Sequence, residues 1–270
     1  MPLIDVSLNS KLFYSLDDST NPWDTPETII FVHGFTESTE VWRCWIPHFT
    51  RKYRVVRFDQ RGFGRSGSVE ESFTYSTELL VSDLSQLIRT ISPEKPVHLI
   101  AGKSGNICAI ATALAHPELV KTISMVSPAI KAPEATGWLE HIDLHGMTSW
   151  ARWTMGDRLG SKMPKIGIEW WINLMGKTAA STAHAYLRWV SGVNLEVSLP
   201  QVKQAVLIVG NESKRRGRAQ FEQYTQLISN AELVMVDVDG YHTGAVAPDQ
   251  CSKVILDFLA KHLIKQGQGL

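Results

Sequence analysis

Three short segments of the chain contain residues that could act as a nucleophile, a base or an oxyanion donor. Each segment directly follows a run of apolar, largely β-branched residues; the segments are 33–35 (HGF), 102–106 (GKSGN) and 240–242 (GYH). A histidine can take a proton from a serine hydroxyl, a lysine amine can attack or deprotonate, and backbone N–H groups can hold a negatively charged oxygen. These residue types indicate acyl-transfer or related carbonyl chemistry, provided that the fold brings the segments together.

The apolar runs themselves predict strands. Continuous runs of this kind are typical of strands that are buried on both faces of a parallel sheet. The predicted strands are 27–34, 53–59, 97–102, 120–127, 205–210 and 232–238, and the predicted helices are 76–91, 106–115, 219–228 and 250–263. This alternation predicts an α/β fold with a doubly wound, mostly parallel sheet, whose ligands bind at the carboxyl ends of the strands.

Residues 128–199 interrupt the alternation, because they contain no convincing strand. We expect a helical cap there, inserted after the sixth strand into a core domain formed by residues 1–127 and 200–270. The segment holds six of the nine tryptophans of the chain. They could form the cap's own core, or they could line a pocket for an apolar or aromatic substrate. The candidate pocket residues are Trp138, Trp150, Trp153 and Trp170.

The order of the three chemical segments, with the segment DQRGFGRS at 59–66 between the first two, resembles the α/β-hydrolase superfamily from about Leu12 to Leu263. The resemblance implies a nucleophile on a tight strand-to-helix elbow, an acid, and His242 as the final base. It also implies an oxyanion hole formed by the N–H of Phe35 and the N–H after the nucleophile, which is Gly105 if Ser104 is that nucleophile. We expect His33 to be structural.

The elbow departs from the family pattern Gly-x-Ser-x-Gly-Gly. Counting without a gap from the preceding strand, or back from the following helix, places Lys103 at the nucleophile position. Chemistry favours Ser104, which is a hydroxyl nucleophile with Gly102 two residues before it, although Asn106 then stands where glycine is usual. The register favours Lys103, and both residues remain candidates.

The acid of the triad is also irregular. The two usual family positions hold Ser127 and Ser213 instead of a carboxylate, and Glu212 is the nearest substitute. A missing acid favours a different role for the elbow. An amine at Lys103, buried at a helix N-terminus under an aromatic cap, would be partly neutral. It could form a Schiff base, act as a base or polarise a carbonyl group.

Composition limits the partners. The chain has 27 Lys and Arg against 27 Asp and Glu, so its zero net charge argues against nucleic acid as the main partner. Residues 214–216 with Arg218 form a basic cluster, which is typical of a solvated surface but could attract an acidic substrate. No apolar run approaches the roughly 18 residues of a membrane span. Three scattered cysteines and the absence of a signal-peptide pattern favour a reduced, cytoplasmic protein.

We therefore expect a cofactor-independent enzyme, without a metal, that hydrolyses an ester, lactone or activated carbonyl bond of a small, apolar or aromatic substrate. The first alternative is a lyase, isomerase or decarboxylase centred on Lys103, and the second is a non-catalytic ligand-binding protein. The expected partner is a small molecule, with neither nucleic acid nor a membrane, and association into a homodimer is left open.

Overall fold

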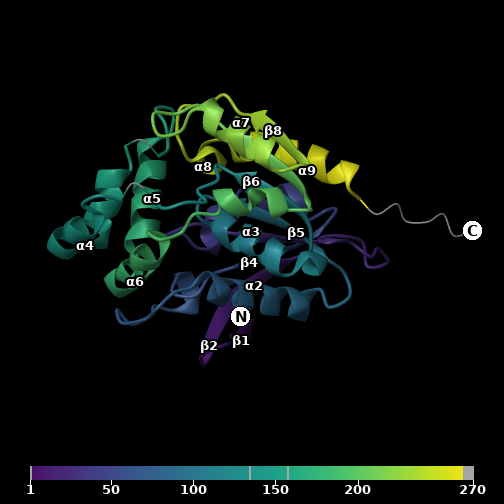
Figure 1. The fold of residues 1–270 in the computed structure, drawn as a ribbon, viewed down its shortest axis with the longest axis horizontal. Helices are drawn as coiled ribbons and strands as arrows, with labels where there is room; N and C mark the ends of the chain where they lie inside the picture. Colours follow the sequence, from purple (N-terminus) through teal and green to yellow (C-terminus); the bar gives the residue numbers. More distant parts are fainter. Residues whose placement is uncertain (1, 134, 157, 264–270) are drawn as a thin grey trace, which may run out of the picture.

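An eight-stranded sheet forms the centre of the computed structural model, which describes residues 2–133, 135–156 and 158–263 (Figure 1). The strand order is β1-β2-β4-β3-β5-β6-β7-β8. The strands are β1 (Leu3–Val6), β2 (Ser10–Asp17), β3 (Thr28–Val32), β4 (Arg54–Phe58), β5 (Val97–Gly102), β6 (Val120–Val126), β7 (Ala205–Gly210) and β8 (Ala231–Met235). β2 pairs with β1 and β4 in antiparallel fashion, and all other pairs are parallel. The α/β class and the six predicted strands are confirmed; β1 and β2 were not predicted.

Strand register brings the chemical segments to one edge of the sheet. β5 lies at the centre and is buried along its whole length. Val32 pairs with Ala101, and Gly102 pairs with Val126. His33, Lys103 and Ser127, which follow β3, β5 and β6, therefore emerge side by side at the carboxyl ends of parallel strands.

Two hydrophobic cores lie on opposite faces of the sheet. Because strand side chains alternate between faces, Ile30 and Val32 join one core while Ile29 and Phe31 join the other. The first core is covered by α2 (Thr77–Ile91), α3 (Gly105–Ala115) and α7 (Arg218–Leu227), and the second by α1 (Ile46–Phe49) and α9 (Pro248–Lys261). The remaining short helices outside the cap are η1 (Thr39–Trp42), η2 (Gly64–Ser66), η3 (Pro117–Leu119) and α8 (Thr243–Val246).

Three helices fill most of the segment between β6 and β7. They are α4 (Trp138–Thr154), α5 (Lys165–Gly176) and α6 (Ala180–Val190), and they lie together on the left of the sheet in Figure 1, before η4 (Glu196–Gln201) leads into β7. The loop after α4 contacts the segment that carries His242, whose backbone N–H donates to the Arg158 carbonyl at 3.0 Å. This contact ties the helical segment directly to a candidate catalytic residue. None of the described helices is long and apolar enough to cross a bilayer.

Candidate active site

The turn between β5 and α3 places Lys103 in a strained conformation. Lys103 has φ 54°, in the left-handed region, which costs a residue other than glycine about 1–2 kcal/mol. Its backbone is held on both sides, because its N–H donates to Val126 O at 3.1 Å and its carbonyl accepts from Ala129 N at 3.1 Å. Asn106 Nδ2 also donates to the carbonyls of Lys103, at 2.9 Å, and Ala101, at 3.1 Å. The asparagine that departs from the family pattern thus fastens the turn.

Close backbone approach at the elbow requires two glycines. A Cβ atom on Gly105 would lie 2.5 Å from the carbonyl oxygens of both Val32 and His33. A Cβ atom on Gly34 would lie 2.9 Å from the Lys103 Cβ. The elbow and the loop after β3 therefore touch through main-chain atoms, so neither can shift without the other.

The side chain of Lys103 is buried beside Tyr241. Its Nζ donates to the Tyr241 carbonyl at 3.4 Å and lies 3.6 Å from the centroid of the Tyr241 ring. Burial lowers the Lys103 pKa well below that of an exposed lysine, and the positive charges of Arg216 and Arg158 lower it further, while Glu37 opposes them. The amine consequently loses its proton at a pH where exposed lysines are still charged.

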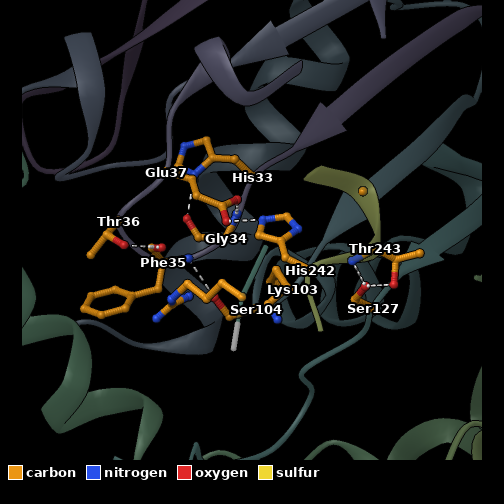
Figure 2. Close-up of polar contacts among 12 residues, drawn as sticks. His33, Gly34, Phe35, Thr36, Glu37, Lys103, Ser104, Ser127, His242 and Thr243 are labelled. Carbon is orange, nitrogen blue, oxygen red and sulfur yellow. Dashed lines mark hydrogen bonds and ion pairs between the residues drawn. The ribbon is translucent and has the colours of Figure 1, made fainter. Parts of the chain in front are cut away.

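Ser104 faces a different set of partners. Its Oγ accepts from the Phe35 N–H at 2.9 Å (Figure 2). It also accepts from the Tyr186 hydroxyl at 3.0 Å. The N–H that was expected to hold an oxyanion is therefore bound to the serine hydroxyl. Among the described residues, no hydrogen bond joins His242 to Ser104 or to Lys103. The serine–histidine contact of an ordinary triad is absent from this part of the chain.

The carboxylate partner of His242 is Glu37, and not the predicted Glu212. His242 Nε2 lies 2.7 Å from Glu37 Oε1, and Glu37 Oε2 accepts from the Gly34 N–H at 2.9 Å (Figure 2). Glu37 and His242 are both buried, whereas Glu212 is exposed in the loop after β7. The prediction of Glu212 was wrong on this point because the chain supplies the carboxylate from the loop after β3. A signal was present in the sequence: Glu37 is the only carboxylate in the first five residues after β3.

The ionisation of this pair follows from its surroundings. Burial alone would raise the pKa of Glu37, but His242 and the Gly34 N–H outweigh burial and lower the pKa to about 2. Burial lowers the pKa of His242, with Glu37 opposing. We assign a neutral imidazole that donates its Nε2–H to the carboxylate and leaves the lone pair on Nδ1. No described residue hydrogen-bonds that buried Nδ1. In a serine triad the acid binds Nδ1, and Nε2 faces the nucleophile. In this protein the carboxylate binds Nε2 instead, so the two ring nitrogens have exchanged roles.

Neutral side chains occupy the usual acid region. Ser127 Oγ donates to Thr243 Oγ1 at 2.7 Å, and Thr243 Oγ1 donates to Asn211 Oδ1 at 2.7 Å. Ser213 is turned toward Arg216 in its own loop. His33 is structural as expected, because its Nε2 accepts from the Gln60 N–H at 2.9 Å. At both positions where the family usually has a carboxylate, a serine side chain is hydrogen-bonded to neighbouring groups instead.

A cavity of about 200 Å³ adjoins the elbow. Lys103, Ser104, Phe35 and Glu37 line it, together with residues of the helical segment and of the loop before α7. Among the four tryptophans predicted for a pocket, only Trp138 lines this cavity.

The other three predicted pocket tryptophans lie elsewhere. Trp150 is buried behind the cavity wall, 5.6 Å from the Phe35 ring centroid. Trp153 is 53% exposed and stacks on the ring of His141. Trp170 lines a separate hollow next to Glu37. The expectation for Trp150 and Trp153 is thus corrected: one belongs to the core, and the other to the surface.

Most of the ionisable residues that line the cavity are cationic. Its cationic lining residues are Lys103, Lys131, Arg158, Arg215 and Arg216, and its acidic lining residue is Glu37. The sequence pattern pointed to residues 214–216 only as a basic cluster, and it gave no signal for Arg158. In the described part of the chain, no cluster of three or more His, Cys, Asp or Glu side chains is arranged to hold a metal ion.

Comparison with known proteins places this geometry in a family. The family model described as "alpha/beta hydrolase fold" matches residues 27–170. Epoxide hydrolase 3 of Xenopus tropicalis is 29% identical over 128 residues, which is 47% of this chain and 32% of that protein. A probable oxidoreductase, EphD, of Mycobacterium tuberculosis (strain ATCC 25618 / H37Rv) is 34% identical over 80 residues, which is 30% of this chain and 14% of that protein. The chain thus spans a third or less of the length of these curated relatives.

Solved structures share the fold at low sequence identity. The enol-lactonase of Burkholderia xenovorans LB400 has a TM-score of 0.86 at 17% identity, covering 96% of this chain and 100% of that chain. A thermophilic esterase of Thermogutta terrifontis has a TM-score of 0.84 at 17% identity, covering 97% and 99%. At such identities the likeness establishes the architecture of the chain.

Proposed function

The chain belongs to the alpha/beta hydrolase fold family, and from this premise we propose that it is a cofactor-independent hydrolase that uses Lys103 in place of the nucleophilic serine. The substrate would be a small ester, lactone or other activated carbonyl compound. One observation carries the proposal: Lys103 has the left-handed elbow conformation and presents a buried amine of lowered pKa to the cavity. Ser104, the alternative, is bonded to Phe35 and Tyr186.

The proposed reaction uses Lys103 as a general base. The neutral amine takes a proton from a water molecule while the water oxygen bonds to the substrate carbonyl carbon, and the carbonyl π electrons move to oxygen. The resulting oxyanion is stabilised by the hydroxyl of Ser104. Among the described residues this hydroxyl accepts both of its hydrogen bonds, so its own proton is left to donate. The ammonium of Lys103 then protonates the leaving group as the carbonyl reforms. The anionic Glu37 favours that transient ammonium.

A second candidate is a lyase that works through a Schiff base on Lys103. A buried amine of lowered pKa can add to a ketone and lose water to form an iminium ion, which withdraws the electrons released when a neighbouring C–C bond breaks. The lowered pKa of Lys103 supports this alternative as well, because an ammonium ion cannot add to a carbonyl group.

Substitution at the elbow tests the proposal. A panel of esters, lactones and β-keto acids would be assayed with the wild type, Lys103→Met and Ser104→Ala, and with Lys203→Met at an exposed position as the control. Removing a general base typically costs about 10²–10⁴-fold in rate. We expect a loss of this size for Lys103→Met, a smaller loss for Ser104→Ala, which removes one oxyanion donor, and none for Lys203→Met. An inactive Ser104→Ala beside an active Lys103→Met would overturn the proposal.

Two further results separate the alternatives. Reduction with borohydride during turnover would attach substrate to Lys103 in the lyase mechanism but not in the hydrolytic one. Equal background rates for the wild type and Lys103→Met across the panel would instead support a non-catalytic, ligand-binding protein.

A further inference from the structure

Three of the cationic residues that line the cavity have no carboxylate partner in the part of the chain that the structure describes. Among the residues that the structure describes, no carboxylate lies within ion-pair distance of Lys103, Arg158 or Arg216. The carboxylate of Glu37 is already engaged by His242 and the Gly34 N–H. A buried guanidinium without a counter-charge is unfavourable, which indicates that an anion completes the site beside Arg158.

Arg158 is the most unusual member of this group. Arg158 is only 6% exposed, yet among the described residues its guanidinium makes a single hydrogen bond, from Nη2 to Thr154 Oγ1 at 3.3 Å. Its Nε has no acceptor among the described residues. The rest of its surroundings is aromatic, with the Trp150 and Tyr241 ring centroids at 5.6 and 5.5 Å. A guanidinium offers donors in a planar fork that matches a carboxylate, and here most of that fork is unused.

Arg216 fixes the position of a second positive charge. Its Nη1 donates to the carbonyls of Ser127, at 2.8 Å, and Pro128, so the guanidinium is anchored at the end of β6. Arg216 and Arg158 are the two strongest charge effects on Lys103. Both arginines therefore contribute positive charge to the part of the cavity that the Lys103 amine lines.

Aromatic and aliphatic side chains form most of the remaining lining. They are Phe35, Ile130, Trp138, Tyr186, Leu187, Val190, Tyr224 and Tyr241. Such a lining matches one anionic group on an apolar body better than a highly charged phosphate or polyanion.

We propose that the cavity takes a small carboxylate with an apolar or aromatic body, and that Arg158 holds the carboxylate group on the wall shared with Lys103 and Arg216. This inference deepens the proposed function by naming the substrate class. The arginines orient the carboxylate so that the carbonyl group of the same molecule lies against Lys103 and Ser104. Arg158 thereby determines specificity, while the proton transfers remain with Lys103.

Binding measurements test this inference without any turnover. Isothermal titration calorimetry would compare benzoate with benzamide, a neutral molecule of nearly the same shape, on the full chain. We expect benzoate to bind about 10- to 100-fold more tightly, as a charge-assisted hydrogen-bonded pair warrants. Arg158→Gln should reduce that preference to within about threefold. Arg152→Gln should preserve it, because Arg152 lies on α4 outside the cavity in an exposed pair with Glu169.

Each other outcome has a definite meaning. Equal binding of benzoate and benzamide to the wild type would overturn the carboxylate site, whatever the Lys103→Met assay shows, and needs no variant to fold. A preference that persists in Arg158→Gln would also overturn it. Inorganic phosphate binding more tightly than benzoate, in a manner that depends on Arg158, would replace a carboxylate substrate with a phosphorylated one.

Discussion

Glu37 and His242 lie 205 residues apart in the chain, and their side chains meet at 2.7 Å. The contact joins the loop after β3 to the loop that precedes α8, so the acid comes from the side of the site that usually supplies only backbone N–H groups. Because Nε2 is the atom that binds Glu37, His242 cannot present that atom to Ser104. The reversed engagement of the imidazole is the strongest geometric argument against an ordinary serine triad.

Replacing Glu37 with Gln should weaken the fold in a pH-dependent way. The folded-state pKa of Glu37, about 2, lies below the ordinary 4.5, so its charge stabilises the fold above pH 4.5 and this stability is lost as the pH falls toward 2. We expect Glu37→Gln to lower the free energy of unfolding at pH 7 by about 1.5–3 kcal/mol, the usual contribution of a hydrogen bond to a charged group, and by less at pH 3. Urea unfolding at pH 7 and pH 3 would check this.

The exposed Glu212 provides the matched control for that experiment. Glu212→Gln should change the free energy of unfolding by less than about 0.5 kcal/mol at either pH. If Glu212→Gln were as destabilising as Glu37→Gln, the assignment of Glu37 as the partner of His242 would be wrong.

Lys103 should have the opposite effect on stability. Its folded-state pKa is lowered, so the unfolded chain binds more protons, and stability rises with pH between the folded-state pKa and 10.5. Lys103→Met should therefore be more stable than the wild type at neutral pH. This advantage should shrink toward pH 10.5, by up to about 1.4 kcal/mol per pH unit. Thermal unfolding across pH 6–10 measures this difference in stability between Lys103→Met and the wild type. The control is Lys203→Met, whose difference from the wild type should not change with pH.

Ser104 should react poorly with serine-directed reagents. Its hydroxyl accepts from Phe35 and Tyr186 and has no base bonded to it among the described residues. A fluorophosphonate followed by peptide mass spectrometry should give little adduct at Ser104 under conditions that label an ordinary serine hydrolase. Rapid stoichiometric labelling would restore the serine mechanism, with Glu37–His242 as its acid and base.

Gly105 should tolerate no side chain. A methyl group there would meet the Val32 and His33 carbonyls at 2.5 Å, and overpacking of this kind costs about 1–3 kcal/mol. Gly105→Ala should lower the melting temperature and disturb the elbow. Gly217→Ala is the control, since a Cβ at Gly217 meets no heavy atom within 4 Å. Equal melting temperatures for the two variants would contradict the close approach of the elbow and the β3 loop.

The sequence predicts the parts of the fold whose own residues carry a clear pattern. The six predicted strands are apolar and β-branched along their length, whereas β2, with the sequence SKLFYSLD, alternates with polar residues, and β1 has only four residues. Ungapped register placed Lys103 at the elbow, and the left-handed φ of Lys103 agrees with that placement.

The parts of the site that sequence did not predict depend on contacts over long separations. The prediction for the loop after β3 covered residues 33–35, with Phe35 as an oxyanion donor and a structural His33, and it did not extend to Glu37. The direction of each cap tryptophan depends on how α4 packs, which residue type does not reveal. Arg158 is an isolated cation in its segment, and only burial without a counter-charge distinguishes it.

The rate at which Lys103 is acylated, measured as a function of pH, tests the central claim most directly. Dilute acetic anhydride and peptide mass spectrometry would follow Lys103 and the exposed Lys203 in the same sample. If Lys103 is the reacting amine, its acylation must reach half its maximal rate at a pH clearly below that of Lys203, and benzoate must slow it. Coincident pH profiles for the two lysines would contradict the account.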